Sequence, residues 1–266
     1  MAAKDSTNVH SGSGDPVRSL ALLWRTQNRR PARNARHDLS VDKIVQAAVE
    51  VADAEGVGAL SMRRVAETLG VGTMTLYTYV PGKAELIDLM LDSAYGEAAR
   101  STEGRGDWRA RLELVARENR ALFHRHPWML QVGISRPPLG PNAIAKYEYE
   151  LQAVDGIGLS EIEMDTVVNL VIGHADTTAR RSVEAALAEK DSGMTDEQWW
   201  QAHAPLLTTL MDYSRYPLAA SVGQAVGSAH GQAYDASHNF EFGLQRILDG
   251  IEVLVAAHRE ADDSAT

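Results

Sequence analysis

The sequence predicts an all-α protein with a small N-terminal three-helix domain and a larger C-terminal helical domain. Three observations support this fold class. Apolar residues recur three and four positions apart in most segments of the 266-residue chain. No segment shows the period-2 alternation of a half-buried strand. Serines that can cap helices and glycines that can end them stand at the boundaries of these segments.

The first part, residues 1–37, is expected to be a flexible, arginine-bearing extension. Residues 1–15 are rich in Ser, Gly, Asp and Asn and are expected to be disordered. The apolar cluster Leu20–Trp24 forms either a brief helix docked on the body or a mobile segment. The stretch Arg25–Arg36 holds five arginines and no acid, and is either a binding arm for a polyanion or a solvated tail.

Residues 38–83 are expected to form three short helices. Ser40 is a good N-cap for the first helix, and Ser61 for the second. Gly70 is placed to end the second helix in the left-handed conformation that glycine allows. The third runs from about Thr73 to Val80 and stops at the Pro-Gly pair that follows.

Two helices joined by so short a glycine turn form a helix-turn-helix, whose second helix enters the major groove of DNA. The stretch LGVGTMTLYTYV also places hydroxyls and flat apolar faces on a very short helix, which suits DNA better than a core. The alternative is a generic helical hairpin with surface tyrosines.

Residues 84–260 are expected to form the C-terminal domain, with 261–266 as a tail. Pro217–Asn239 is rich in Ala, Gly and Ser and is expected to be a mobile loop. The expected helices are one from Lys83, Trp108–His124, Pro141–Val154, one from the Ser160–Glu163 capping box towards Lys190, Thr195–Tyr213 with an interruption at Pro205, and His238–Glu260.

Charge and composition narrow the function. The net charge is −10, but residues 1–83 carry +3 and the remainder −13, as a local polyanion-binding module would produce. The chain has no cysteine, which excludes disulfides, zinc–thiolate sites and thiol nucleophiles. No apolar run approaches the ~20 residues of a membrane span, and no signal-peptide core precedes Leu20. We therefore expect a cytoplasmic protein without a membrane partner.

The stretch RHDLSVDKIVQAAVEVADAEGVGALSMRRVAETLGVGTMTLYTYVPGKAELIDLM resembles the N-terminal domain of TetR-family transcriptional repressors, without gaps from Leu39 to Met90. The later stretch FEFGLQRILDGIE resembles the last helix of the tetracycline-repressor-like C-terminal domain. The resemblance implies a homodimeric repressor that binds a near-palindromic double-stranded operator and is released by a small-molecule effector. A helical enzyme and a non-DNA-binding adaptor remain as alternatives. Neither the operator nor the effector follows from the sequence.

The resemblance also implies roles for residues of the helix-turn-helix. Arg63 matches an arginine that family members place on a guanine edge, and bidentate Arg–guanine contacts are the commonest specific ones on physical grounds. Thr78 stands where the tetracycline repressor has a tryptophan, so its operator cannot be transferred. The expected DNA-binding set is Ser61, Met62, Arg63 and Arg64; Thr73, Met74 and Thr75 for base reading; Thr78; and Tyr77, Tyr79 and Lys83 for phosphate contacts.

The effector site is less well defined. The stretch MLQVGISRP resembles the segment in which the tetracycline repressor holds its magnesium-bound drug, but Gln131 replaces a metal-ligating histidine and Ile134 a threonine. Gln is a poor ligand for Mg²⁺, so we expect no metal, no cofactor and no metal-dependent tetracycline binding. The candidate ligand-binding residues are His124, Trp128, Gln131, Tyr147, His174 and Trp200.

Each of these candidates has a simpler structural interpretation. His124 and His126 stand at a helix end, where capping is the favoured role. His174 lies inside an apolar run and is either a core or interface histidine or a polar anchor in a pocket. The aromatic residues, taken singly, are more often core than ligand wall.

The last helix carries more apolar residues than one face can hold. Glycine inside a helix costs ~1 kcal/mol relative to alanine, and close approach of another helix is a compensating gain. The long helix after Ser160 is also apolar on several sides, so the two helices either form a four-helix dimer interface or are buried within one subunit. The expected interface residues are Val171, Gly243, Ile247, Gly250 and Leu254.

Overall fold

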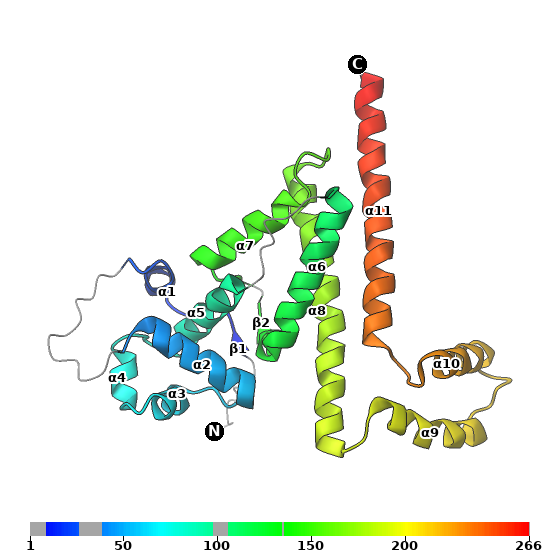
Figure 1. Cartoon of the computed structure of the whole chain (residues 1–266), viewed down its shortest axis with the longest axis horizontal. Helices are drawn as coiled ribbons and strands as arrows, with labels where there is room; N and C mark the ends of the chain where they lie inside the picture. Colours follow the sequence, from blue (N-terminus) through cyan, green and yellow to red (C-terminus); the bar gives the residue numbers. More distant parts are fainter. Residues whose placement is uncertain (1–8, 27–38, 98–105, 135, 266) are drawn as a thin grey trace.

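The computed structural model describes residues 9–26, 39–97, 106–134 and 136–265. Within these ranges the fold is helical, which confirms the predicted class (Figure 1). The described residues form strand only in a two-residue parallel pair, β1 (Val9–His10) with β2 (Val132–Gly133). None of the described helices has both the length and the apolar character that a membrane crossing needs.

The N-terminal domain contains α2 (Val41–Glu55), α3 (Met62–Thr68) and α4 (Thr73–Tyr77). The Ser40 hydroxyl caps α2 by accepting a hydrogen bond from the Lys43 N–H at 3.2 Å, as predicted. The third helix is shorter than expected. It ends at Tyr77, and Thr78 and Tyr79 form a hydrogen-bonded turn after it. The proline that follows Val80 disfavours a helical conformation for Val80 itself.

The C-terminal domain is built on a core of long helices. These are α5 (Lys83–Gly96), α6 (Trp108–Arg125), α7 (Pro141–Gln152), α8 (Glu161–Ser192) and α11 (Ala236–Ala265), with the short 3₁₀ turn η1 (Pro127–Gln131) after α6. Helix α5 belongs to both domains, since it packs against α2 on one side and α7 on the other. Helices α6, α8 and α11 run alongside one another (Figure 1).

Helices α9 (Asp196–Leu210) and α10 (Pro217–His230) connect the lower ends of α8 and α11 (Figure 1). Two expectations are wrong here. Pro205 does not interrupt α9, and α10 forms where a mobile loop was expected. Pro217 stands in the first turn of α10, where proline is tolerated, and the alanines that follow favour a helix.

Residues 9–25 are not a disordered leader, which corrects the expectation for residues 9–15. They comprise β1, a short connection, helix α1 (Pro16–Leu23) and the two residues that follow it. Helix α1 packs on α5. Leu22 and Leu23 are buried, so the apolar cluster is a docked helix rather than a mobile segment. We call residues 9–25 the N-terminal strap. The arginines at positions 29, 30, 33 and 36 lie outside the described residues.

Candidate nucleic-acid interface and ligand pocket

Helices α3 and α4 form a helix-turn-helix. The Ser61 hydroxyl caps α3 by accepting a hydrogen bond from the Arg64 N–H at 3.1 Å. Gly70 then reverses the chain with φ +65°, a conformation that L side chains rarely adopt. Buried Val65 and Leu76, one from each helix, fix the two against the domain core. The sequence predicted the caps and the turn correctly.

Helix α4 buries one side chain and exposes most of the others. Leu76 is fully buried, whereas Met74 is 76 % exposed and Tyr77 43 % exposed. The Thr78 hydroxyl donates to the Thr75 carbonyl at 2.6 Å. Of the other residues predicted to contact DNA, Thr75 and Thr78 are exposed, and Thr73 and Tyr79 are half-buried. The helix therefore presents hydroxyl, thioether and phenol groups on one short surface.

The two arginines of α3 differ in their partners. Arg63 is almost fully exposed and pairs with Glu67 one turn on, with Nε 2.8 Å from Oε1; this contact raises the pKa of Arg63. Arg64 donates through Nε and Nη2 to Glu55 at the end of α2, and this contact lowers the pKa of the Glu55 carboxyl. Arg63 is thus the arginine free to exchange its partner, while Arg64 ties α3 to α2.

Met62 is buried with the core, so its side chain does not face the surface as the sequence-based set implied. Lys83 begins α5 at the edge of the same domain and is half-buried, and this burial lowers the pKa of its ammonium group. Among the described residues no carboxylate pairs with Lys83. A partly desolvated cation at a helix N-terminus favours an external anion such as a phosphate.

The six candidate ligand-binding residues do not share one cavity. Trp128 is buried in the core of the C-terminal domain, and its indole N–H has no hydrogen-bond partner among the described residues. His124 and Gln131 are exposed. Tyr147 is exposed too and donates to Asp165 Oδ1 at 2.8 Å, a contact that raises the pKa of its phenol.

His174 makes its contacts within the subunit. Its Nε2 lies 2.8 Å from the Phe240 carbonyl oxygen, and the imidazole stacks on the Phe240 ring with centroids 5.6 Å apart. Gly243 allows this contact, because a Cβ there would overlap the imidazole ring. The structure therefore gives His174 the simpler of its two roles, a histidine between α8 and α11.

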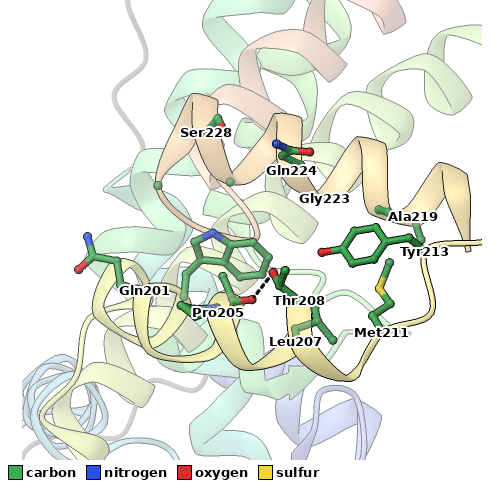
Figure 2. Close-up of a pocket in the computed structure, with 15 residues that line it drawn as sticks. Gln201, Pro205, Leu207, Thr208, Met211, Tyr213, Ala219, Gly223, Gln224 and Ser228 are labelled. Carbon is green, nitrogen blue, oxygen red and sulfur yellow. Dashed lines mark hydrogen bonds between the residues drawn. The ribbon is translucent and has the colours of Figure 1, made fainter.

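Trp200 lines a pocket of about 570 Å³ between α9 and α10 (Figure 2). Gly223 and Gly227 form a smooth wall on α10, and a Cβ at Gly227 would lie only 2.6 Å from the Trp200 indole nitrogen. Met211 and Tyr213 lie at one end of the pocket and Gln201 at the other (Figure 2). Within the described part of the chain no charged side chain lines this pocket, and its volume falls in the range of small-molecule sites.

Pro205 leaves a backbone carbonyl group, that of Gln201, free to bond to a ligand in the pocket. It lacks the N–H that would bond to the Gln201 carbonyl in an α-helix, and both residues line the pocket. The Thr208 hydroxyl, also in the lining, donates to the Ala204 carbonyl at 2.9 Å (Figure 2). The proline can be seen in the sequence, but the pocket itself exists only because α9 pairs with α10.

No group of three or more histidine and acidic side chains in the described part of the chain could hold a metal ion.

The predicted dimer-interface residues differ in their burial within the subunit. Val171 is fully buried within its own subunit, which corrects the expectation that it faces a partner. Ile247 and Leu254 are half-buried, and Ile247 packs against the subunit core. Gly243 makes room for the His174 ring. Gly250 is exposed, with open space around the position of a Cβ.

Comparison with known proteins agrees with this architecture. Residues 44–90 match the profile of bacterial regulatory proteins of the tetR family, and residues 101–255 match the tetracyclin repressor-like C-terminal domain. The chain is 47 % identical over 250 residues to the HTH-type transcriptional repressor DrrR1 of Streptomyces coeruleorubidus, covering 94 % of this chain and 90 % of that protein. It is 34 % identical over 204 residues to an HTH-type transcriptional regulator of Saccharopolyspora erythraea, covering 71 % and 81 %.

Solved structures show the same fold. The crystal structure of ActR from Streptomyces coelicolor in complex with actinorhodin superposes with a TM-score of 0.68 at 26 % identity, covering 82 % of this chain and 99 % of that one. Apo ActR gives a TM-score of 0.65, also at 26 % identity, over 85 % and 100 %. With both domain profiles matched and a relative that spans nearly the whole chain, this protein belongs to the TetR family of bacterial transcriptional regulators.

Proposed function

We propose that this chain is a homodimeric transcriptional repressor that binds a near-palindromic operator and is released by a small-molecule effector. The exposed surface of α4 beside Arg63 carries the proposal, because it offers base-reading and phosphate-binding groups on a helix small enough for a major groove. The two half-sites are expected about one helical turn, ~34–36 Å, apart.

Two substitutions test the division between base reading and positioning. Arg63→Ala is expected to weaken binding to the preferred operator roughly 5- to 150-fold and to relax the choice at one base position. Lys83→Ala is expected to weaken binding on all sequences and reduce the salt slope by about one unit. Arg259→Ala, an exposed cation at the far end of α11, is the matched control.

The readout is a gel shift on the protein's own promoter region and on random duplex DNA at several salt concentrations. If both variants lose the same amount on every sequence, the division of roles is wrong. If the wild type fails to bind any DNA at low salt, the repressor proposal fails, and the helical enzyme and the adaptor become the leading alternatives.

The arginine stretch needs a narrower test than truncation, since removing residues 1–37 would also remove the docked strap. Substituting the arginines at positions 29, 30, 33 and 36 with glutamine leaves the strap in place. If these side chains enter a narrow A·T-rich minor groove, affinity falls and the salt slope decreases. Unchanged affinity and slope would show that the stretch is a solvated tail.

The α9–α10 pocket is our candidate for the effector site. Its uncharged lining, with Trp200, Met211 and Tyr213, suits a flat apolar ligand, and the relative ActR is known in complex with actinorhodin. Actinorhodin is therefore the first probe. We expect it to release the wild type from its operator, and Trp200→Ala to require a higher concentration for the same release. Trp199→Ala, a neighbouring tryptophan outside the lining, is the control.

The same assay tests the metal prediction. Tetracycline with Mg²⁺ is expected to cause no release, because Gln131 and Ile134 stand where the tetracycline repressor has a histidine and a threonine. Release by tetracycline that requires Mg²⁺ would contradict this prediction.

A further inference from the structure

The N-terminal strap begins on the C-terminal domain. Strand β1 pairs with β2, and the Ser11 N–H donates to the Gly133 carbonyl at 3.1 Å. The Ser11 hydroxyl, on a residue only 2 % exposed, donates to the Arg136 carbonyl at 2.5 Å. Buried hydrogen bonds of this kind are costly to break without replacement. This end of the strap is therefore firmly attached.

The middle of the strap binds α5, the helix shared by the two domains (Figure 1). The Gly12 N–H donates to Asp88 Oδ1 at 2.9 Å, and the Asp15 N–H donates to Glu85 Oε1 at 3.3 Å. Both carboxylates are buried. Burial raises the pKa of Asp88, and the hydrogen bond from Gly12 opposes that rise. The strap thus supplies donors to carboxylates on the face of α5 that it covers.

The far end of the strap reaches the DNA-binding domain. The Trp24 indole N–H donates to the Leu139 carbonyl at 2.8 Å, just before α7. The next residue, Arg25, places Nη2 2.5 Å from Asp42 Oδ1 in the first turn of α2. The strap is therefore held by the C-terminal domain and the connecting helix, and it touches the DNA-binding domain through the solvent-exposed Arg25–Asp42 ion pair.

The backbone course of the strap depends on Gly12. Its φ is +64°, and a Cβ there would lie 2.9 Å from the Arg136 Cβ. A side chain at Gly12 would meet both backbone strain and a steric overlap. The neighbouring Ser13 is exposed and bonds only locally, through its hydroxyl to the His10 carbonyl at 3.0 Å. Ser13→Ala is therefore a matched control for Gly12→Ala.

From these contacts we infer that the strap is an intramolecular clamp that fixes the angle of the DNA-binding domain on α5 and so sets the separation of the two recognition helices in the dimer. The inference rests on the proposed function for its effect on DNA, but the clamp itself is a property of one subunit. A device that holds this angle selects operators by the spacing of their half-sites.

The DNA test uses an operator selected by the wild type from random duplex DNA, and two versions with the half-sites moved one base pair closer or farther apart. The wild type is expected to lose about tenfold on each altered version, ~1.4 kcal/mol. For Gly12→Ala we expect weaker binding to the selected operator and less than about threefold discrimination by spacing, and for Ser13→Ala the wild-type pattern. A chain lacking residues 1–26, compared with one lacking residues 1–8, provides the second variant.

The second measurement needs no DNA. The chain has no cysteine, so Glu50→Cys on α2 and Ala121→Cys on α6, both exposed positions, give two unique labelling sites. Spin-label distances are measured in protein diluted into excess unlabelled wild type, so that only pairs within one subunit are seen. We expect a narrow distribution with the intact strap and a broader or shifted one with Gly12→Ala or the 1–26 deletion.

The two measurements separate the possible failures. An unchanged distance distribution in both variants overturns the clamp, even if stability and affinity fall. Equal losses on all three DNA spacings overturn its role in operator choice. If the wild type selects no DNA, the proposed function fails, and the distance measurement alone decides whether the strap fixes the domain angle.

Discussion

His126 lies where the two domains meet, and both of its ring nitrogens face carboxylates. Nδ1 lies 2.9 Å from Asp53 Oδ1 on α2, and Nε2 lies 3.0 Å from Glu97 Oε2 just after α5. The side chain is 4 % exposed, so the imidazole bridges the domains out of contact with water. His126 is the C-cap residue of α6, in line with the capping role that the sequence favoured, and its ring in addition joins three elements.

Substituting His126 should therefore cost stability. His126→Ala would remove the ring to which the Asp53 and Glu97 carboxylates bond, and we expect it to lower the free energy of unfolding by ~2 kcal/mol. His124→Ala, an exposed histidine two residues earlier, is the control and should change it by less than about 0.5 kcal/mol. Urea denaturation followed by circular dichroism measures both. Equal effects would mean that the bridge contributes nothing.

At the scale of the element, the turn between α3 and α4 depends on one backbone conformation. Gly70 has φ +65°, and no other side chain or distant backbone atom lies within 4 Å of the place that a Cβ would take, so Gly70→Ala meets backbone strain but no clash. We expect it to lower the free energy of unfolding by ~1 kcal/mol, with a smaller loss for Gly70→Asn. Gly58→Ala is the control, since Gly58 has equally open space and no positive φ. Thermal unfolding that ranks Gly58→Ala as equally harmful would contradict this account.

The start of α8 gives a pH prediction. Glu163 accepts from the Ser160 N–H at 2.9 Å and from its hydroxyl at 2.8 Å, and these hydrogen bonds hold the pKa of Glu163 below its usual 4.5. A lowered pKa means that the stabilisation is present above pH 4.5 and is lost as pH falls through the folded-state pKa. The stability difference between wild type and Glu163→Gln should therefore shrink on acidification below pH 4.5. A difference that stays constant from neutral to acid pH would rule out the charged cap.

The elements predicted well are those whose signals are local. Ser40, Ser61 and Ser160 cap the helices expected of them, because a cap depends on residues only three positions away. Helix α10 was missed because small residues and glycines favour a loop locally, and its pairing with α9 depends on tertiary contacts. The docking of Ser11 and Gly12 was missed for the same reason, since their partners lie more than 70 residues away.

The candidate sites follow the same division. The predicted DNA-contact residues lie close together in the sequence, on α3, on α4 and at the start of α5, and the family resemblance assigned their roles. Met62 is the member of this set that the structure buries. The ligand candidates come from five segments of the chain, and nothing in the order of residues says which of them meet. Trp200 lines the pocket, while Trp128, of the same residue type, is buried elsewhere. Residue type indicates a pocket wall only after the helices have been placed.

At the scale of the whole molecule, α8 and α11 lie side by side and leave apolar groups uncovered (Figure 1). Ile162 and Leu170 on α8 are 81 % and 51 % exposed, and Phe242 and Val253 on α11 are 59 % and 71 % exposed. A second copy of these two helices would cover them in a four-helix arrangement about a two-fold axis, which is the interface we propose.

Gly250 lies on the same exposed stretch of α11 and distinguishes a dimer from a monomer. Within the described part of the subunit nothing approaches a Cβ at this position, so in a monomer Gly250→Leu would meet no clash and would add a good helix former, raising stability by up to ~1 kcal/mol. In the proposed interface the same side chain would hold the partner helix away. We expect Gly250→Leu to be folded by circular dichroism, to sediment as a monomer of about 29 kDa at micromolar concentration, and to lose binding to the full operator. Ala121→Leu, which adds an equivalent group to an exposed position on α6, should remain dimeric and bind DNA. A Gly250→Leu variant that stays dimeric, or a wild type that sediments as a monomer, would show that the exposed residues of α8 and α11 serve another purpose.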